Sequence, residues 1–521
     1  MRCTSPPRPV TPCTTSPPTS FAATTSAGRT LVRVVVIGAG LGGLSAACHL
    51  AGRGHEVTVI EAGTVPGGRT GLREVDGFRF DTGPSVLTMT GLLSDTFAAA
   101  GADMADHLRL SPVDPMYRAV FADGTTVHVR HGREAMTAEI RQQCGPAEAV
   151  AFGRFCDWLG ELYRLELPNF IDRNFDSPLD LARPLKPAID LVRLGGFRKL
   201  GNVVDSYFAD ERLRKLFSFQ ALYAGLSPFE ALAVYSIITY MDTVEGVWFP
   251  EGGMHAIPRG LAAAATAAGA VFRYGTMVER IERPGAGPDR LRVRLASGER
   301  LGADAVVANP DLPEVYRTLL PELDAPRAAR KGQFSPSCVV WHVGAKGSPP
   351  AGAAHHNIHF GAAWERSFTE LLTDGRAQSD PSILITIPTV GDPSLAPEGH
   401  TALFVLEPCG NLGGSADWAL ETPRVMARLR ARVAGLGYPV DDIVVEDVVG
   451  PIEWEQQGMA RGTPFALSHR FRQTGPFRPG NTDRRVPGLV LVGSGTVPGV
   501  GVPMVLLSGR LAAERVDELD R

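Results

Sequence analysis

Paired cysteines are missing from this sequence. It contains seven cysteines, and no two of them have the C-x-x-C spacing of a zinc site or a dithiol redox centre. An odd number of cysteines without a framework also fits a reducing compartment better than a secreted protein. We therefore expect no metal site and a cytoplasmic location.

A basic surplus and a long apolar run are also missing. The formal net charge is −4, so we expect no nucleic-acid partner. The longest uncharged stretch, 486–508, is interrupted repeatedly by glycine and proline, which a membrane-spanning helix would rarely tolerate. We predict no transmembrane helix and, without the roughly 7–15-residue apolar core of a signal peptide, no export.

Residues 1–29 contain no acidic residue and are rich in proline, serine and threonine. Such a segment cannot bury enough apolar surface to offset the entropy lost on ordering, so we predict a disordered tail. The composition is also that of a transit peptide. A disordered extension, or a start codon assigned too early, is the favoured explanation.

Glycine is abundant, and its clearest cluster follows the first apolar run. Residues 31–37 predict a buried strand, the glycine-rich turn 38–43 follows, and a helix then runs to about Arg53. A second strand, 57–60, ends at Glu61. Strand, glycine turn, helix and strand in this order form a βαβ unit, which predicts a Rossmann-like dinucleotide site.

The glycines of this turn have separate functions. Gly38 allows the tight turn, Gly40 lets the backbone approach a pyrophosphate, and Gly43 permits close contact between helix and strand. The phosphates then lie at the helix N-terminus, where free amide groups and the helix dipole favour anions. Glu61 is placed to accept hydrogen bonds from the adenosine ribose.

A second glycine turn, Gly67-Gly68-Arg69, identifies the dinucleotide as FAD. Its arginine can pair with the pyrophosphate, and the turn resembles the extension found in flavin enzymes of the glutathione reductase and amine oxidase type. No second G-x-G-x-x-G follows a strand, so the sequence predicts no separate nicotinamide site. The closing stretch 491–503 packs four glycines between a strand and a helix and predicts the contact with the flavin ring.

Both ends of the chain are therefore predicted to belong to one α/β FAD-binding domain, with an α+β substrate domain inserted. We place the FAD-binding domain at 30–98, 250–312 and 484–521. The substrate and membrane-contacting domain takes 99–249 and 313–483. A return strand, 305–308, and a last strand, 489–492, complete the first sheet.

The middle of the chain is predicted to contain helices and hairpins. Residues 134–241 are expected to be mainly helical, with a helix beginning at Ser227 and capped by Glu230. Strands and helices alternate over 330–450. Asp123-Gly124 and Ser297-Gly298 each lie between two strand-like runs and predict type I′ turns.

Several segments together resemble bacterial-type phytoene desaturases, a family of carotenoid desaturases and isomerases in the FAD-dependent amine-oxidase-like superfamily. The resemblance is carried by GAGLGG at 38–43, PGGR at 66–69, FDTGPS at 80–85, the stretch 207–259 and VGSGTVPGVGVP at 492–503. The last of these, with VWFPEGG at 247–253, is much more specific to carotenoid desaturases than the first. The resemblance covers nearly the whole chain after residue 30.

The resemblance implies a flavoenzyme that inserts conjugated double bonds into a long hydrocarbon, converting phytoene to lycopene or to an intermediate. It implies hydride transfer to flavin N5, loss of a neighbouring proton, and a quinone or oxygen as final electron acceptor. The expected FAD-binding residues are Gly38, Ala39, Gly40, Gly43, Glu61, Gly68, Arg69, Gly83, Val278, Gly493, Gly495, Gly501 and Val502.

A carotene precursor has no polar group, so its binding depends on apolar area, at roughly 25 cal/mol per Å². Residues 216–258 contain no lysine or arginine and many aromatic side chains, which suits the wall of an apolar tunnel; an ordinary helical core explains the pattern equally well. The candidate catalytic residues are the pair Asp180 and Arg183, Asp242, and His255.

The substrate is a lipid, so we expect the enzyme to attach peripherally to a membrane. Residues 179–200 combine apolar and basic side chains and predict an interfacial helix pair, although a solvated amphipathic face is the alternative. Two other functions stay open: another FAD oxidase of this fold, such as an amine or protoporphyrinogen oxidase, and a prenyl-binding protein of the Rab GDP-dissociation-inhibitor type.

Overall fold

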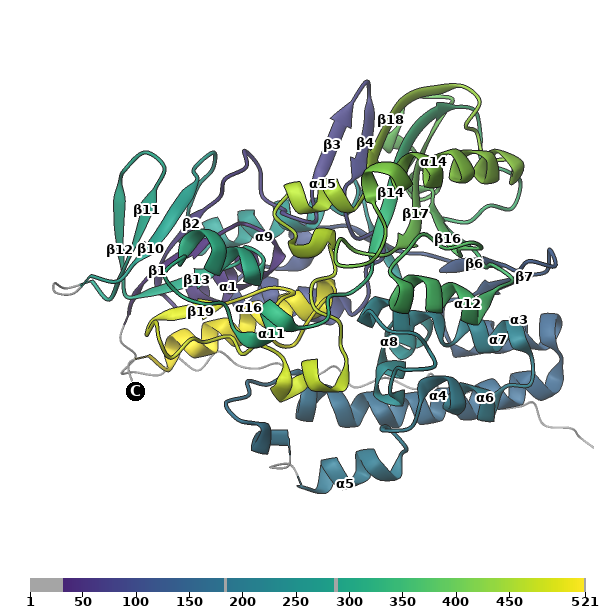
Figure 1. Cartoon of the computed structure of the whole chain (residues 1–521), viewed down its shortest axis with the longest axis horizontal. Coiled ribbons are helices and arrows are strands. Elements are labelled where there is room, and N and C mark those ends of the chain that lie inside the picture. The colour runs from purple at the N-terminus through teal and green to yellow at the C-terminus, as the bar shows by residue number, and fades with distance from the viewer. Residues whose placement is uncertain (1–30, 182–184, 285–288, 520–521) are drawn as a thin grey trace, which may run out of the picture. The chain divides into compact units, whose positions relative to one another are not determined.

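The computed structural model describes residues 31–181, 185–284 and 289–519. The predicted tail 1–29 and Arg183 lie outside these residues. Residues Val32–Arg521 form one unit, and all of the helices and strands named below belong to it. Figure 1 shows the course of the chain.

Five parallel strands form the sheet that the βαβ unit begins, in the order β19-β13-β1-β2-β9. Strands from the beginning, the middle and the end of the chain are therefore neighbours in one sheet. The return strand and the last strand predicted from the sequence are confirmed, and so is the α/β fold class. The strands are β1 (Arg33–Ile37), β2 (Glu56–Ile60), β9 (Val271–Arg273), β13 (Ala305–Ala308) and β19 (Leu489–Leu491).

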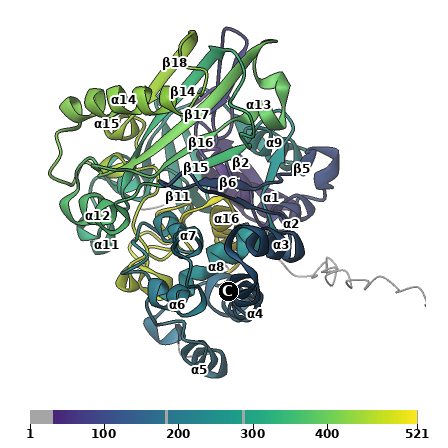
Figure 2. The same ribbon diagram turned by 90° about the vertical axis from the view of Figure 1, so that its right-hand side faces the viewer.

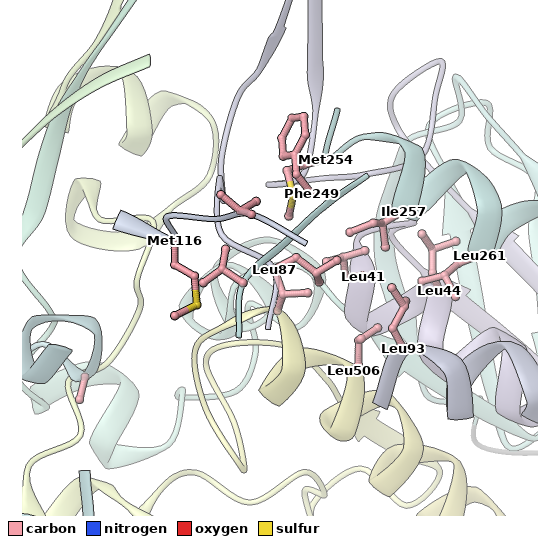
Figure 3. Close-up of a cluster of buried hydrophobic side chains, with 14 of the residues drawn as sticks. Leu41, Leu44, Leu87, Leu93, Met116, Phe249, Met254, Ile257, Leu261 and Leu506 are labelled. Atoms are coloured by element: carbon pink, nitrogen blue, oxygen red, sulfur yellow. The ribbon is translucent and has the colours of Figure 1, made fainter. Parts of the chain in front are cut away.

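Helix α1 (Leu41–Gly52) is the centre of the core beside this sheet. It is apolar almost all round and packs against α16 (Val502–Asp517), α9 (Ala256–Ala267) and α2 (Thr90–Ala99). Figure 3 shows the leucine and isoleucine side chains that meet between these helices. Each fully buried leucine contributes roughly 1.5–3 kcal/mol, so this contact fixes the glycine turn that precedes α1.

Three smaller antiparallel sheets occur among the described residues. β3 (Leu72–Val75) pairs with β4 (Phe78–Asp81), β5 (Leu110–Pro112) pairs with β8 (Trp248–Pro250), and three antiparallel strands form the third. The hairpin predicted around Gly298 is confirmed within it, but its type I′ turn is wrong. Gly298 has a positive φ and Ser297 does not, whereas a type I′ turn needs both. These three strands are β10 (Val278–Glu282), β11 (Leu291–Leu295) and β12 (Arg300–Ala303).

Seven strands form a mixed sheet in the second half of the chain, in the order β18-β14-β17-β16-β15-β6-β7. The hairpin β6–β7 joins it through a parallel pairing with β15. The predicted type I′ turn of this hairpin is also wrong, because only Gly124 has a positive φ, while the Asp123 carboxylate accepts from the Thr125 amide. The strands are β6 (Tyr117–Val120), β7 (Thr126–Val129), β14 (Ser337–Lys346), β15 (His356–His359), β16 (Ile383–Thr386), β17 (His400–Cys409) and β18 (Ile443–Val449).

The chain that follows β7 is mainly helical up to Glu245, as predicted for 134–241. Among the described residues of 179–200, where a helix pair was expected, the structure forms the end of the 3₁₀ helix Pro178–Leu181 and the helix α5. Figures 1 and 2 both place α5 at the edge of the unit. The helices are α3 (Arg133–Cys144), α4 (Pro146–Glu166), α5 (Leu185–Arg193), α6 (Leu200–Tyr207), α7 (Glu211–Leu216) and α8 (Ser236–Thr239).

The helix predicted to begin at Ser227 does not form. Ser227 Oγ accepts from the Glu230 amide (3.2 Å), as a cap would, but the chain makes only one turn before the short helical segment Ala233–Tyr235. The Glu230 carboxylate does not close a capping box and lies 3.5 Å from Arg470. A local capping signal was therefore overridden by a contact that is distant in sequence.

The remaining elements connect and cover the sheets. Among the described residues, no helix has both the length and the apolar character needed to cross a membrane. The elements are α10 (Leu312–Glu314), α11 (Arg327–Lys331), α12 (Trp364–Thr369), α13 (Pro388–Gly391), α14 (Trp418–Gly435) and α15 (Pro451–Gln456).

Candidate active site

One cavity of about 1070 Å³ runs from the parallel sheet into the helical region and the mixed sheet. Typical small-molecule sites have roughly 300–1,000 Å³, so this volume suits more than one small ligand. Its wall at one end consists of turns that follow β1, β2, β13 and β19. The carboxyl ends of parallel strands are the place where ligands bind in sheets of this kind.

The first glycine turn brings strand β1 and helix α1 into close contact. Gly38 has φ +95° and Gly40 lines the cavity. A Cβ on Gly43 would lie 2.1 Å from the Gly38 carbonyl oxygen, so no side chain fits there. Ala39 and Gly43 form the back of the turn, outside the cavity lining, and hold its shape.

Glu61 follows β2 and lines the cavity beside this turn. Its carboxylate accepts from the Ala39 amide (2.6 Å) and from the Gly63 amide (2.7 Å). The glycine turn and the acid predicted to bind ribose are therefore joined directly, in the arrangement that a dinucleotide needs.

Asn309 is a residue of this site that sequence reasoning missed. It follows β13, which pairs with β1, and its Oδ1 accepts from the Gly43 amide (2.6 Å). A Cβ on Gly40 would lie 3.1 Å from the same oxygen. The sequence signal was present, because Asn309 ends a predicted strand of the same sheet and its side chain had to emerge at the cofactor edge.

The second glycine turn holds Arg69 at the cavity. Gly68 has φ +55° and lies against Gly40, while a Cβ on Gly83 would lie 1.9 Å from the Arg69 carbonyl oxygen. The Arg69 guanidinium lies 3.3 Å from the Asp311 carboxylate and donates to Ser494 Oγ at 3.4 Å. Its Nε is buried and has no hydrogen-bond partner among the described residues.

The last glycine turn closes the same end of the cavity. Gly493, Gly501 and Val502 line it, and Gly501 precedes the first turn of α16. Gly495 lies outside the lining and packs on Leu312, whose Cβ would be 2.7 Å from an added Cβ. Val278, at the start of β10, lines the cavity as well.

Arg478, which no sequence signal identified, holds this last turn in place. It is buried and donates to the carbonyl oxygens of Ser494 (2.6 Å) and Thr496 (3.0 Å). It also donates to the carbonyls of Leu467 and Gln473. Burial lowers the pKa of Arg478 to about 10, so the guanidinium remains charged at neutral pH.

These residues fit FAD. Several side-chain-free positions face the cavity, and an arginine with an unsatisfied Nε stands beside them. The helix N-terminus of α1 supplies free amide groups for phosphate. The cofactor end of the cavity thus carries both features of a dinucleotide site, close backbone approach and positive charge.

The other end of the cavity is apolar. Aromatic and aliphatic side chains line it from helices and from the mixed sheet, among them Phe170, Phe219, Ile238, Met241, Ile358, Phe360, Trp364 and Phe368. Of the stretch 216–258, which lacks lysine and arginine, only part lies in the wall. Phe217 and Phe249 are buried in the core outside the lining, so the tunnel and the core interpretations each hold for part of the stretch.

Asp242 is the one predicted catalytic residue on the cavity wall. It is buried on the turn 240–245, where Thr243 Oγ1 donates to it at 2.9 Å and Gln220 Nε2 at 3.4 Å. Burial raises the pKa of the Asp242 carboxyl to about 7. Its charge therefore changes close to neutral pH.

Asp180 and His255, two other predicted catalytic residues, lie outside the cavity lining. Asp180 is buried outside the cavity lining and accepts from the amides of Asp176 and Ser177, and Arg183 lies outside the described residues. His255 stands behind the second glycine turn, not in the lining, with Nε2 2.8 Å from the Pro66 carbonyl oxygen. Burial lowers the pKa of His255, so a neutral ring that supports the turn is what this geometry provides.

Comparison with known sequences gives a consistent result. The model of the family described as flavin containing amine oxidoreductase matches residues 41–517. The chain is 51% identical to the phytoene dehydrogenase of Streptomyces griseus, over 93% of this chain and 94% of the relative. It is 39% identical to the zeta-carotene-forming phytoene desaturase of Myxococcus xanthus, over 93% of each.

A solved structure shows the same fold. Wild-type putrescine oxidase bound to putrescine aligns with a TM-score of 0.57 at 17% identity, over 94% of this chain and all of that one. The likeness concerns the arrangement of the two sheets and the helices around them.

Proposed function

We propose that the protein converts phytoene to lycopene or to an intermediate. The chain belongs to the flavin-containing amine oxidoreductases, and the relatives compared above are phytoene desaturases. It is therefore an FAD-dependent carotenoid desaturase. The observation that supports this substrate is the single cavity that joins the dinucleotide-binding turns to a long apolar wall. A hydrocarbon can lie in that wall and reach the cofactor without contact with water. An amine substrate would leave the apolar wall without a function.

We propose that FAD is held by the turns described above. Glu61 binds the adenosine ribose, the α1 N-terminus and Arg69 bind the pyrophosphate, and the turn 493–502 lies against the ring. When bound, the flavin supplies the oxidant that accepts a hydride from the hydrocarbon. The protein's own contribution is to exclude water, to position the chain and to take the second hydrogen as a proton.

Asp242 has a place in this proposal. Hydride loss leaves positive charge on the hydrocarbon, and a carboxylate in a low-dielectric wall stabilises such charge. Asp242 lines the cavity, and the hydrogen bonds from Gln220 and Thr243 hold its carboxyl group in position. We propose that it stabilises the developing cation once it is ionised.

We propose that the enzyme takes its substrate from a membrane. Leu185 and Val192 on α5 are exposed, as are Phe471 and Phe477. Phe471 and Phe477 are in ring contact (5.7 Å between centroids) and also line the cavity, so exposed apolar side chains form part of its wall. Lys186 and Arg193 on α5 suit anionic headgroups. A quinone dissolved in that membrane, or oxygen, is the proposed electron acceptor.

The division into two parts also remains a proposal. Residues 30–98, 250–312 and 484–521 would bind FAD, and 99–249 with 313–483 would bind the hydrocarbon. The strand order of the parallel sheet supports the first set. The apolar lining contributed by helices and by the mixed sheet supports the second.

Expression in cells that accumulate colourless phytoene tests the proposed reaction. Yellow or red pigment, with conjugated double bonds in its absorption spectrum, is the expected result. Purified protein that is folded and flavin-loaded but leaves phytoene unchanged would exclude the reaction. A colourless protein without flavin would instead favour a prenyl-binding function.

A further inference from the structure

Among the described residues, five carboxyl groups line the cavity, and they differ in whether they have a hydrogen-bond or ion-pair partner. Four of them have a hydrogen-bond or ion-pair partner that accounts for their position, and Glu166 has none. The partners are the Ala39 and Gly63 amides for Glu61, Arg69 for Asp311, Arg317 for Glu314, and Thr243 with Gln220 for Asp242.

Glu166 is buried, and no described residue hydrogen-bonds to its carboxyl group. Leaving a buried polar group unsatisfied costs about 1–3 kcal/mol, so such a group in a native structure calls for a functional explanation. The backbone also changes here. Glu166 is the last residue of α4, and a π-helical turn, Leu167–Ile171, follows it. Turns of this type occur frequently at functional sites.

Its neighbours place Glu166 on the wall shared with the last glycine turn. Tyr235 and His469 line the same cavity as Glu166. Tyr235 donates to the carbonyl oxygen of His469. An added Cβ on Gly499 would lie 2.2 Å from His469 Cε1. Glu166 therefore shares the cavity wall with two side chains, of which His469 packs against the turn proposed to contact the flavin.

We propose that Glu166 is the catalytic residue that accepts the proton lost by the hydrocarbon, an inference that rests on the proposed desaturase function. One C–H bond breaks, and its hydrogen leaves with both bonding electrons as a hydride, which the flavin accepts. The C–H bond on the neighbouring carbon breaks as a proton, which forms an O–H bond with Glu166. The electrons of that second bond form the new C=C bond, and the proton leaves Glu166 for water before the next cycle.

The proposal has a definite pH dependence. Burial raises the pKa of Glu166 well above its usual value, and no charged group contributes to the shift. Only the ionised form accepts a proton, so turnover rises as the pH increases through this pKa. The titratable groups around the second half of α4 are Asp190 and Arg193 on α5, Tyr207 on α6, Tyr235 and His469 on the cavity wall, and Tyr240, Asp242 and Glu245 on the turn 240–245.

Three variants of the FAD-loaded, full-length protein test the assignment. Glu166→Gln keeps the shape and removes the base, and Glu166→Asp keeps an acid but shortens its reach. Glu161→Gln, at an exposed position on the same helix, is the matched control. Single-turnover flavin reduction by phytoene is measured from acidic to basic pH, with flavin content and thermal stability measured for each variant.

We expect Glu166→Gln to retain FAD and fold while turnover falls about 100-fold or more and no longer rises with pH. Glu166→Asp keeps the rise with reduced turnover, and Glu161→Gln matches wild type. Infrared spectra of the substrate-free protein should lose one protonated-carboxyl band in Glu166→Gln. Wild-type turnover with an unchanged pH profile in Glu166→Gln would overturn the assignment. Failure of the wild-type protein to desaturate phytoene would instead overturn the proposed function.

Discussion

At the scale of single residues, the ionisable groups buried in the cavity wall have the largest effect on stability and catalysis. The cavity wall must be apolar to hold a hydrocarbon, yet it contains ionisable groups whose charged forms are destabilised by burial. Their protonation states therefore couple folding to pH as well as to catalysis.

Asp242 gives the first prediction. Its pKa is raised to about 7 by burial, so the folded protein holds a proton that the unfolded chain releases above its ordinary value near pH 4. The contribution of Asp242 to stability is thus greatest below about pH 4 and falls, by the order of a few kcal/mol, as the pH rises from about 4 to 7. Asp242→Asn should remove this part of the slope.

Chemical denaturation of both proteins at several pH values between 4 and 8 measures the effect. At pH 8, where Asp242 is ionised, the variant should turn over about tenfold more slowly, because it lacks the stabilising charge. Identical stability slopes in the two proteins would show that Asp242 is not buried as a titrating group.

Arg478 gives the second prediction. Its guanidinium joins four carbonyl oxygens around the last glycine turn, and lysine cannot reproduce this planar arrangement. Arg478→Met should lose FAD on dialysis, and Arg478→Lys should bind it at least about tenfold more weakly. Arg472→Met, at an exposed position nearby, should retain it. The ratio of flavin to protein absorbance measures the FAD content of each variant. Full flavin content in Arg478→Met would contradict the assigned role.

At the scale of elements, the contact of α1 with β1 is the most constrained feature. A side chain on Gly43 meets the Gly38 carbonyl oxygen, so Gly43→Ala should move the first turn of α1 and abolish FAD binding. Gly435→Ala is the matched control, because nothing lies within 4 Å of its Cβ. That change sits at the end of α14 and should be neutral or stabilising by about 0.5–1 kcal/mol. Flavin absorbance and melting temperature of the two variants test this, and a flavin-loaded Gly43→Ala would contradict it.

Local patterns predicted the elements well where one signal decided them. Four strands of the parallel sheet and its glycine turns followed from apolar runs and turn residues, and so did the two hairpins, whereas β9 was not predicted. The type I′ turns were wrong, because neither Asp123 nor Ser297 has a positive φ, and each side chain instead accepts from the amide two residues further on. The helix at Ser227 was wrong, because a capping motif does not include contacts distant in sequence, such as the pairing of Lys199 with Leu232.

The site was predicted only in part for a related reason. Motif residues such as Gly38, Glu61 and Arg69 can be identified in the sequence by their spacing. Glu166 and Arg478 acquire their positions from the packing of segments far apart in sequence, and nothing in their neighbouring residues distinguishes them from surface charges.

At the scale of the whole molecule, the exposed apolar side chains of α5 predict binding to lipid. The double variant Leu185→Glu, Val192→Glu should bind vesicles that contain anionic lipid about tenfold more weakly, because charge replaces apolar contact. The double variant Val150→Glu, Val444→Glu places the same two charges at other exposed apolar positions, on α4 and β18, and should bind as wild type does. Vesicle flotation measures this. Equal binding of all three proteins would place the membrane contact elsewhere.

One measurement tests most directly the claim that a single cavity brings FAD and a long hydrocarbon together. FAD-loaded protein is mixed without oxygen or quinone with phytoene in vesicles, and the flavin absorbance is followed beside the carotenoid spectrum. The account predicts bleaching of the flavin with one new double bond formed per flavin. Flavin that stays oxidised with phytoene, but is bleached by an amine, would contradict it.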